Sequence, residues 1–555
     1  MTALAIQNFS HLLAFKEKLK AWLLENFLLQ EQARYTLFFS YGGPSARCKV
    51  WSSSDPEPQV LIKRVLKYID QQFEKHRRLP EFLKFDIAVN VEEESFKQVI
   101  AQVTGQQHNN HYRKGMSFDS SFNLCFLEQE LYARAIIKGL VYSQPNFFDQ
   151  DNLNAAIKKK YPQLKTGLQL DKIQKVWTFD TLSCFYEQGQ LIPLQSMGTA
   201  NGVRYLSNPK KQHIRELVLK NAHFLHSQIQ EDGRFIYGYF PAYAHQIKSY
   251  NTVRHCTAVY ALIETLEVEY QTQYLAKIKQ AIDYALATFY KQIDHKAFML
   301  DGKPDQYEIK LGANAAAIFM LCKYQEVTGD DGYLKQAEQL ANGICAMINS
   351  HGETTHVLHY PSLEVKEKFR IIYYDGEAAL GLLRLYQINQ NPKLLDLVKL
   401  MFEHFISKNY DQYHDHWLSY CTNELTKICP EPKYFEFGLN NYLKHMDFIR
   451  NRKTVYATFL EMMMSAYKMV THLKAQGHTA LFETAKFEAL KELIELRVDF
   501  QRNGFFYPEV AMYLAEPQQV LDAFYVRHDR LRTRIDDQEH NLSGYVAYLN
   551  HFEPV

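Results

Sequence analysis

The second half of the chain carries a helical pattern of apolar and polar positions that repeats. Segments 267–285, 326–344 and 387–405 each end one apolar helix, make a polar turn and begin another helix, in which Leu275, Leu334 and Leu395 take matching places. The period is about 60 residues, which fits one helix pair per repeat. Because each pair needs neighbours to bury its apolar face, the repeat predicts an array of helical hairpins.

The apolar periodicity predicts twelve helices. They fall at 212–230, 252–268, 272–291, 311–327, 332–350, 375–388, 393–409, 414–427, 432–450, 453–476, 480–501 and 540–553. Six hairpins of this kind close most simply into an (α/α)6 toroid, in which alternate helices form an inner and an outer ring. The even-numbered helices are rich in Ala, Gly and aliphatic residues and are expected inside, whereas the odd-numbered ones carry the polar stripes of an outer face.

The first part of the chain has a different pattern. Segments 34–41 and 81–89 have the alternation and the aromatic or β-branched content of strands, and 60–76 between them has helical spacing. We therefore expect an α+β domain at 1–165, a connecting segment at 166–209 and the toroid at 210–555. The predicted fold class is mainly α, an (α/α)6 toroid preceded by a smaller α+β domain.

The predicted inner helices all begin with polar residues. In a toroid their N-terminal ends converge on one end of the barrel, and these ends are 251–255, 310–314, 373–377, 414–417, 451–456 and 534–540. Helix capping explains one short polar side chain at each place but not Arg, His, Tyr and paired carboxylates together. The pattern predicts a cleft at this end of the barrel.

Acid–base chemistry in such a cleft requires carboxylates, imidazoles or phenols. The candidate catalytic residues are Asp375, Glu377, Asp536, Asp537, His540 and Tyr374. The candidate substrate-binding residues are Asn251, Arg254, His255, Lys310, Asn314, His414, His416, Trp417 and Arg534. Among these, three cations would bind a carboxylate or phosphate group of the substrate: Arg254, Lys310 and Arg534.

Structural roles remain open for several of these residues. Arg254 could pair with Asp375 or Asp536 to set the helix register, and His255 and His540 could be core histidines. No metal site is expected, since His414 and His416 stand two apart at a helix start, where side chains diverge by about 200°.

Three stretches carry a resemblance to known proteins: RHCTAVYALIETLE (254–267), YYDGEAALGLLRLYQ (373–387) and RIDDQEHNLSGY (534–545). With the repeat, they make residues 210–555 resemble the six-hairpin sugar-acting proteins, which include N-acylglucosamine 2-epimerase-like enzymes, unsaturated glucuronyl hydrolases and the C-terminal domain of D-glucuronyl C5-epimerases. The resemblance implies a sugar or anionic oligosaccharide ligand, and either epimerase or isomerase chemistry or hydrolase or lyase chemistry. It does not include the first domain.

A role from another class stays open, namely a non-catalytic binding scaffold in a biosynthetic or maturation complex, with the N-terminal domain holding a protein partner. Lys plus Arg (63) balance Asp plus Glu (62), which gives no case for nucleic acid or an anionic membrane as a partner. The chain shows no secretory signal, no membrane-length apolar run and no CxxC pair, so a cytoplasmic protein is expected. No phosphate-binding glycine loop occurs and no cofactor is expected.

Overall fold

The computed structural model describes residues 3–106, 112–139 and 145–553, which form two compact units. The first, which we call the sheet unit, comprises Met1–Ser207, Tyr239–Ile247 and Asn503–Thr533. The second, which we call the toroid unit, comprises Asn208–Gly238, Lys248–Arg502 and Arg534–Val555.

The sheet unit is built on a seven-stranded antiparallel sheet. Its strands are β1 (Tyr35–Gly43), β2 (Ala46–Asp55), β3 (Phe82–Ser95), β4 (Gly115–Ser117), β5 (Cys125–Phe126), β8 (Lys175–Glu187) and β9 (Gln190–Leu194). The order across the sheet is β2-β1-β3-β8-β4-β5, and β9 pairs with β8. In the central register, Phe39 lies opposite Phe85, and Phe85 lies opposite Cys184.

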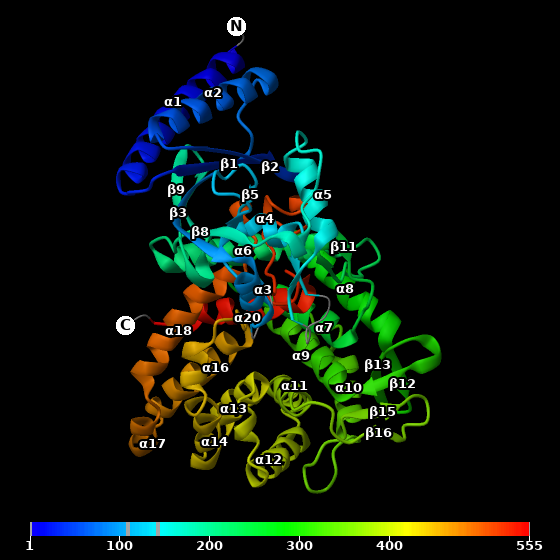
Figure 1. Cartoon of the computed structure of the whole chain (residues 1–555). Helices are drawn as coiled ribbons and strands as arrows, with labels where there is room; N and C mark the ends of the chain where they lie inside the picture. The colour runs from blue at the N-terminus through cyan, green and yellow to red at the C-terminus, as the bar shows by residue number, and fades with distance from the viewer. Residues whose placement is uncertain (1–2, 107–111, 140–144, 554–555) are drawn as a thin grey trace. The chain divides into compact units, whose positions relative to one another are not determined.

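Two helices, α1 (Ala3–Leu28) and α2 (Pro58–His76), cover one face of this sheet (Figure 1). Alternate residues of β1, such as Leu37 and Phe39, turn toward them and pack with Phe15, Leu19 and Leu61 in one hydrophobic core. The remaining short elements are α3 (Phe96–Thr104), α4 (Glu128–Ala133), β6 (Ile137–Lys138), β7 (Phe147–Phe148), α5 (Gln150–Lys160) and α19 (Pro508–Ala511).

The predicted domain boundaries differ from the structure in two places. Residues 166–209, expected as a connecting segment, contain β8, which lies in the interior of the sheet because β3 and β4 both pair with it. Residues 503–533, expected in the toroid, lie in the sheet unit instead. There the backbone of β2 donates hydrogen bonds from Cys48 to Met512 (2.8 Å) and from Arg47 to Ala515 (3.2 Å).

The toroid unit contains two concentric sets of helices, as Figure 1 shows from α6 to α20. The inner helices are α7 (Thr252–Thr265), α9 (Leu311–Thr328), α11 (Tyr373–Asn389), α13 (His416–Ile428), α16 (Thr458–Ala475) and α20 (Ile535–His551). The outer helices are α6 (Lys210–Ser227), α8 (Thr272–Phe289), α10 (Leu334–Cys345), α12 (Pro392–Ser407), α14 (Pro432–Leu443) and α18 (Phe487–Gln501). Two short helices, α15 (Met446–Asn451) and α17 (Thr479–Thr484), join them.

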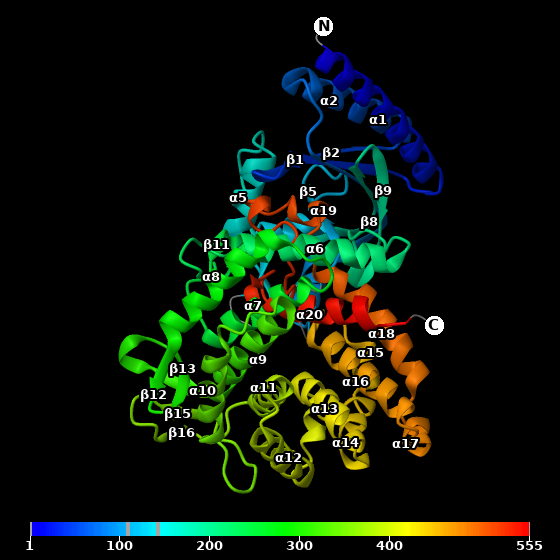
Figure 2. The same cartoon turned by 180° about the vertical axis from the view of Figure 1, so that it is seen from behind.

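Each inner helix packs against the next, and α20 packs against α7, so the inner ring closes. Figure 2, the view from behind, shows three outer helices outside the inner helices on which they pack: α12 on α11, α14 on α13 and α18 on α16. Burial follows this arrangement, since every residue of α9 from Leu311 to Tyr324 is buried. The (α/α)6 toroid and the separate α+β unit predicted from the sequence are confirmed.

The toroid unit also contains a five-stranded sheet, whose strands precede the inner helices α9 and α11 in the chain. It comprises β12 (Tyr290–Ile293), β13 (Lys296–Asp301), β14 (Glu308–Lys310), β15 (Val357–His359) and β16 (Val365–Glu367). β14 runs directly into α9, and β16 precedes α11, so the sheet fixes where these inner helices begin. A further sheet has three short strands in the order β11-β10-β17. They are β11 (His245–Gln246), β10 (Gly238–Phe240) and β17 (Thr533–Arg534). Among the residues described, no helix is long and apolar enough to span a bilayer.

The closed ring requires close approach of the inner helices, and Gly376 of α11 shows how close. A Cβ placed on Gly376 would lie 2.7 Å from the backbone nitrogen of Leu418 and from the carbonyl carbon of Trp417, both in α13. At Gly381, one turn further along α11, the nearest atom would be the Ala315 carbonyl oxygen at 3.2 Å.

We expect Gly376→Ala to destabilise the protein by about 1–3 kcal/mol because α13 backbone has to move. Gly381→Ala is the matched control, since both substitutions gain about 1 kcal/mol of helix propensity, but the added Cβ comes to 2.7 Å of backbone at Gly376 and only to 3.2 Å at Gly381. Chemical denaturation of the two variants measures the difference. Equal stabilities would contradict the close packing of α11 on α13.

Candidate active site at the helix mouths of the toroid unit

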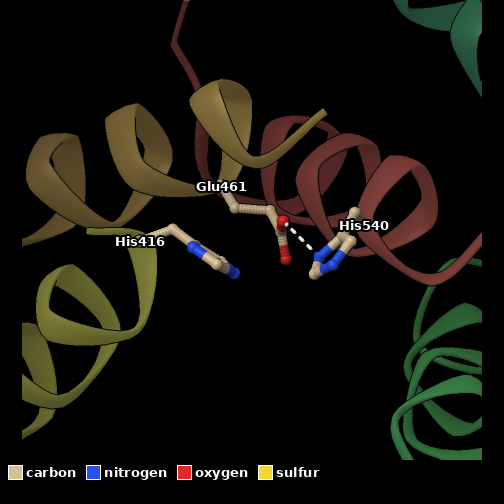
Figure 3. A group of neighbouring side chains, drawn as sticks. All are labelled: His416, Glu461 and His540. Atoms are coloured by element: carbon tan, nitrogen blue, oxygen red, sulfur yellow. Dashed lines mark hydrogen bonds and ion pairs between the residues drawn. The ribbon is translucent and has the colours of Figure 1, made fainter. Parts of the chain in front are cut away.

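Three polar side chains from three inner helices meet at one end of the toroid unit (Figure 3). His416 opens α13, Glu461 lies in the first turn of α16, and His540 lies in the second turn of α20. One nitrogen or oxygen atom from each lies within 4.8 Å of the others. We call these three side chains the histidine–glutamate cluster.

Hydrogen bonds at the helix starts position this cluster. Asp415 caps α13, because its Oδ2 accepts the Leu418 N–H at 2.9 Å. Asp537 holds the start of α20, because its Oδ2 accepts the Arg534 N–H at 2.8 Å. The Tyr420 hydroxyl donates to Oε1 of Glu461 at 3.1 Å and so fixes the carboxylate.

The charge of His540 is set by two carboxyl groups. Its Nδ1 lies 2.9 Å from Oε2 of Glu461 and 3.1 Å from Oε2 of Glu539. Burial alone would lower the pKa of His540, but these two acidic groups outweigh that effect and raise the pKa to about 10. Burial raises the pKa of Glu539 well above its usual range. The cluster therefore holds an imidazolium at position 540, with Glu461 as its hydrogen-bonded carboxylate.

The two ring nitrogens of His416 have different surroundings. Its Nδ1 lies 3.2 Å from Oδ1 of Asp415, and its Nε2 has no hydrogen-bond partner among the described residues. The imidazole ring lies 5.2 Å from the ring of His540 and 5.3 Å from that of Tyr373, measured between centroids. His416 thus offers an unshared nitrogen beside a protonated imidazole.

A pocket of about 250 Å³ lies against His416. Its lining includes Tyr373, Tyr413, His414, His416, Phe448 and Tyr456. Tyr413, Phe448 and Tyr456 are 46%, 48% and 38% exposed, although aromatic side chains usually bury most of their area. Flat apolar faces that carry hydroxyl groups suit a ligand with a ring and several hydroxyls.

Glu377 is a second unusual acid near the cluster. It is 3% exposed, and its Oε2 has no hydrogen-bond partner within the residues described. Burial, reinforced by the negative charge of Asp415, raises its pKa to about 8. Gly312 of α9 makes the room for it, because a Cβ there would lie 2.1 Å from Oε2 of Glu377.

Two neighbours of Glu377, proposed from the sequence as catalytic, contact structural partners. Asp375 is buried and accepts a hydrogen bond from the Thr354 hydroxyl at 2.6 Å, and its other oxygen lies 2.9 Å from Nε2 of His356. Tyr374 packs its ring on His356 at 5.4 Å. Both side chains therefore anchor α11 on the loop that precedes β15.

The acidic pair at the start of α20 is matched by arginines. Oδ2 of Asp536 lies 2.9 Å from Nε of Arg254 and 2.8 Å from a terminal nitrogen of Arg534, and Asp537 is the cap described above. The ion pair between Arg254 and Asp536, which the sequence left open, is present. Two cations thus face two carboxylates, which leaves no surplus positive charge for an anionic ligand from these four groups.

Five further candidates lie in structural environments rather than in the pocket, and the first two are His255 and Trp417. His255 is fully buried between the Tyr250 hydroxyl (2.7 Å) and the Ala281 carbonyl (2.8 Å), and burial lowers its pKa to about 4. Trp417 is 3% exposed and stacks on Phe319. They are core residues, because α7 and α13 turn these positions toward neighbouring helices.

The other three candidates are Asn314, Lys310 and Asn251. The side chain of Asn314 bridges the Met299 N–H (2.8 Å) and the Lys310 carbonyl (2.7 Å). Lys310 pairs with Asp301 at 2.5 Å. Asn251 caps α7 by accepting the Arg254 N–H at 3.1 Å.

His414 and His416 diverge, as their spacing predicts. His414 lies before α13 with a φ of 50°, its Nδ1 is 2.8 Å from the Asn441 carbonyl, and its ring stacks on His445. Both histidines line the pocket, but only His416 joins His540 and Glu461.

Sequence reasoning missed Glu461, and it marked Tyr373, Asp415 and Glu539 only as parts of the polar helix starts 373–377, 414–417 and 534–540, without a role of their own. The signal for Glu461 was present, since it is one carboxylate in the apolar run FLEMMM (459–464) on a predicted inner helix. A buried charge in such a run requires a partner, and the partner is His540. Sequence spacing also indicated no metal-ligand set, yet the fold gathers one that is compact enough to hold an ion from three helices.

No family model matches the chain, and no curated protein matches it. Among solved structures, a cellobiose 2-epimerase from Bacillus thermoamylovorans is similar at 13% identity, over 62% of this chain and 100% of its own, with a TM-score of 0.48. A D-mannose isomerase is 11% identical over 62% of this chain and 98% of its own, with a TM-score of 0.44. An α-1,6-mannanase from a Salegentibacter species is 10% identical over 60% of this chain and 98% of its own, with a TM-score of 0.43.

By name these are a sugar epimerase, a sugar isomerase and a glycoside hydrolase, the kinds of protein that the sequence resembles. The three TM-scores lie below 0.5, so the toroid assignment rests on the helix packing itself.

The raised pKa of Glu377 gives a pH-dependent expectation. Its pKa rises on folding from 4.5 to about 8, so the native state binds more protons than the unfolded state between these values, and stability falls as the pH rises. Gln carries no such titration. Denaturation at pH 5, 6.5 and 8 should therefore show Glu377→Gln gaining stability relative to wild type with each step.

The exposed Glu492 of α18, changed to Gln, is the control for general effects of a lost carboxylate. A difference between Glu377→Gln and wild type that stays constant over this pH range would show that Glu377 is ionised in the folded protein throughout.

Proposed function

We propose that the toroid unit is a sugar-acting enzyme that transfers protons at a carbon next to a carbonyl group, as in the epimerisation or isomerisation of a reducing sugar. The observation that carries the proposal is the pairing of His416, with an unshared Nε2, and His540, held as an imidazolium. Such a reaction needs one base and one acid on either side of the reacting carbon.

Nε2 of His416 takes the proton from the carbon next to the carbonyl of the open-chain sugar, and the electron pair moves to the carbonyl oxygen to give an enediolate. For epimerisation, His540 returns a proton to the other face of the same carbon and the carbonyl forms again. For isomerisation, His540 protonates the former carbonyl carbon, and the hydroxyl proton of the neighbouring carbon moves to the former carbonyl oxygen. Proton exchange with solvent then restores the starting protonation of the two histidines. The positive charge at position 540 also stabilises the negative charge of the enediolate.

The pocket supports a sugar as the ligand. Its volume of about 250 Å³ is smaller than the usual range for drug-sized ligands and suits one monosaccharide unit. Tyr413, Phe448 and Tyr456 offer ring faces and hydroxyl groups to it. The three similar solved structures bear names of sugar-acting enzymes, but the support for this proposal is the site geometry.

A second candidate reaction is glycoside hydrolysis, and Glu377 is the observation that favours it. A carboxyl group with a pKa raised to about 8 stays protonated near neutral pH, as a general acid requires. The acids that would have to act as its base or nucleophile, Asp375 and Asp536, are held by structural partners, which makes this candidate the weaker one.

We expect the full-length protein to convert at least one sugar in a panel of aldoses, N-acyl amino sugars, hexuronates and reducing disaccharides to an epimer or a ketose, measured by chromatography. His416→Gln and His540→Gln should each lower the rate by about a hundredfold or more, because each removes one proton-transfer group. Glu461→Gln should shift the pH profile, because it removes the carboxylate that keeps His540 charged.

The matched control is His351→Gln, an exposed histidine of the toroid unit outside the cluster. We also expect a chelator to leave the rate unchanged, because metal binding requires a deprotonated imidazole and His540 is already paired with Glu461. Hydrolysis of aryl glycosides that depends on Glu377 would favour the second candidate. Loss of activity on chelation would instead make the cluster a metal site.

A further inference from the structure

The sheet unit contains a cavity that the proposed function does not use. It has a volume of about 540 Å³ and lies on the hairpin of β1 and β2. Its other walls come from α2, from the end of α4 and from the end of α5. All of its lining residues lie between Tyr41 and Gln163, within the sheet unit.

The charge of this cavity is one-sided. Among the described residues that line it, none is a carboxylate and five are cations: Arg47, Lys49, Arg134, Lys159 and Lys160. Behind the wall, the acid Glu130 lies 2.6 Å from Lys160 and 3.9 Å from Arg134. The single negative charge of Glu130 is shared between two of the five cations, so the cavity keeps a surplus of positive charge.

Three of these cations are held in place, whereas Lys49 and Lys159 are exposed. The side chains of Lys160 and Arg134 are only 4% and 13% exposed. Arg47 is half-buried, and its guanidinium donates to the carbonyls of Ala133 and Tyr513 at 2.6 Å each. Groups that are held in place in a hollow bind an anion with less ordering cost than free surface lysines do.

One wall of the cavity is aromatic. Trp51 stacks on Tyr68 with ring centroids 5.3 Å apart, and the Tyr68 hydroxyl lies 2.7 Å from that of Tyr41. A stacked indole beside several cations suits a ligand that joins an anionic group to a ring.

A second hollow of about 380 Å³ shares Tyr41, Arg47 and Lys49 with the first and adds His76 and Arg78. Its lining contains one acid, Glu81. The two hollows together extend the basic surface along the hairpin, which leaves room for more than one anionic group.

We propose that this cavity binds a small organic phosphate with at least two negative charges, with its ring against Trp51 and its phosphates against the cations of α5 and β2. The site is independent of the proton-transfer chemistry proposed for the toroid unit. The ring could be a nucleobase or a sugar, and the test below separates these two sources.

Isothermal titration calorimetry on the full-length protein tests the site with three probes: inorganic pyrophosphate, uridine diphosphate and glucose 1-phosphate. We expect pyrophosphate to bind, with an affinity that falls as salt is added. If the ligand of this site is a nucleotide, uridine diphosphate should bind most tightly. If the ligand is a sugar phosphate, glucose 1-phosphate should bind most tightly.

Lys159→Glu should weaken binding by about tenfold or more, because it reverses a charge at the cavity wall. Lys158→Glu is the matched control, since Lys158 is exposed on the same helix but does not line the cavity. Trp51→Ala should weaken the binding of the ring-bearing probes and leave the affinity for pyrophosphate unchanged, because only the ring is placed against Trp51.

Three results would overturn the proposal. They are no binding of any probe at millimolar concentration, equal losses in Lys158→Glu and Lys159→Glu, and binding of a single-stranded oligonucleotide without binding of any small probe. The last result would identify a nucleic-acid surface in place of a small-molecule site.

Discussion

Closure of the inner helical ring is the constraint on which the toroid unit depends. Each inner helix is covered by an inner neighbour on both flanks and by an outer helix behind, so polar groups in its first turns are removed from water and require partners. The start of α11 shows the consequence, because Asp375 is held by Thr354 and His356 while Glu377, without such partners, keeps a proton. The close packing of the ring requires small residues such as Gly376. It also brings Glu377, His416, Glu461 and His540 together at the N-terminal ends of the inner helices.

Within that end, charge balance separates site residues from structural ones. Arg254 and Arg534 are matched by Asp536 and Asp537, and this network holds the start of α20. His540, six residues into the same segment, is instead balanced by Glu461 of α16 and stays partly open, with 24% of its side chain exposed. Pairing across the ring thus places a charged imidazole, that of His540, beside the unpaired Nε2 of His416.

Much of this architecture follows from sequence periodicity. The repeat and the alternation of apolar and polar-striped helices predicted the toroid and its inner helices, and the polar helix starts predicted the end at which His416 and His540 lie. What could not be predicted was orientation, since successive residues of a helix point about 100° apart and a rotation of that size decides whether His255 faces the core or a pocket. The interior strand β8 was missed because its strand alternation was not recognised, and the place of residues 503–533 depends on backbone hydrogen bonds to β2 that leave no periodic signal.

Hydrogen exchange at carbon tests the central claim most directly. A sugar panel incubated with the protein in deuterium oxide and followed by NMR reports whether a C–H bond next to the carbonyl is broken, whatever product accumulates. The account predicts deuterium at that carbon in at least one sugar, with exchange lost in His416→Gln. A folded protein that exchanges no sugar C–H bond, or one whose exchange survives the loss of His416, would contradict it.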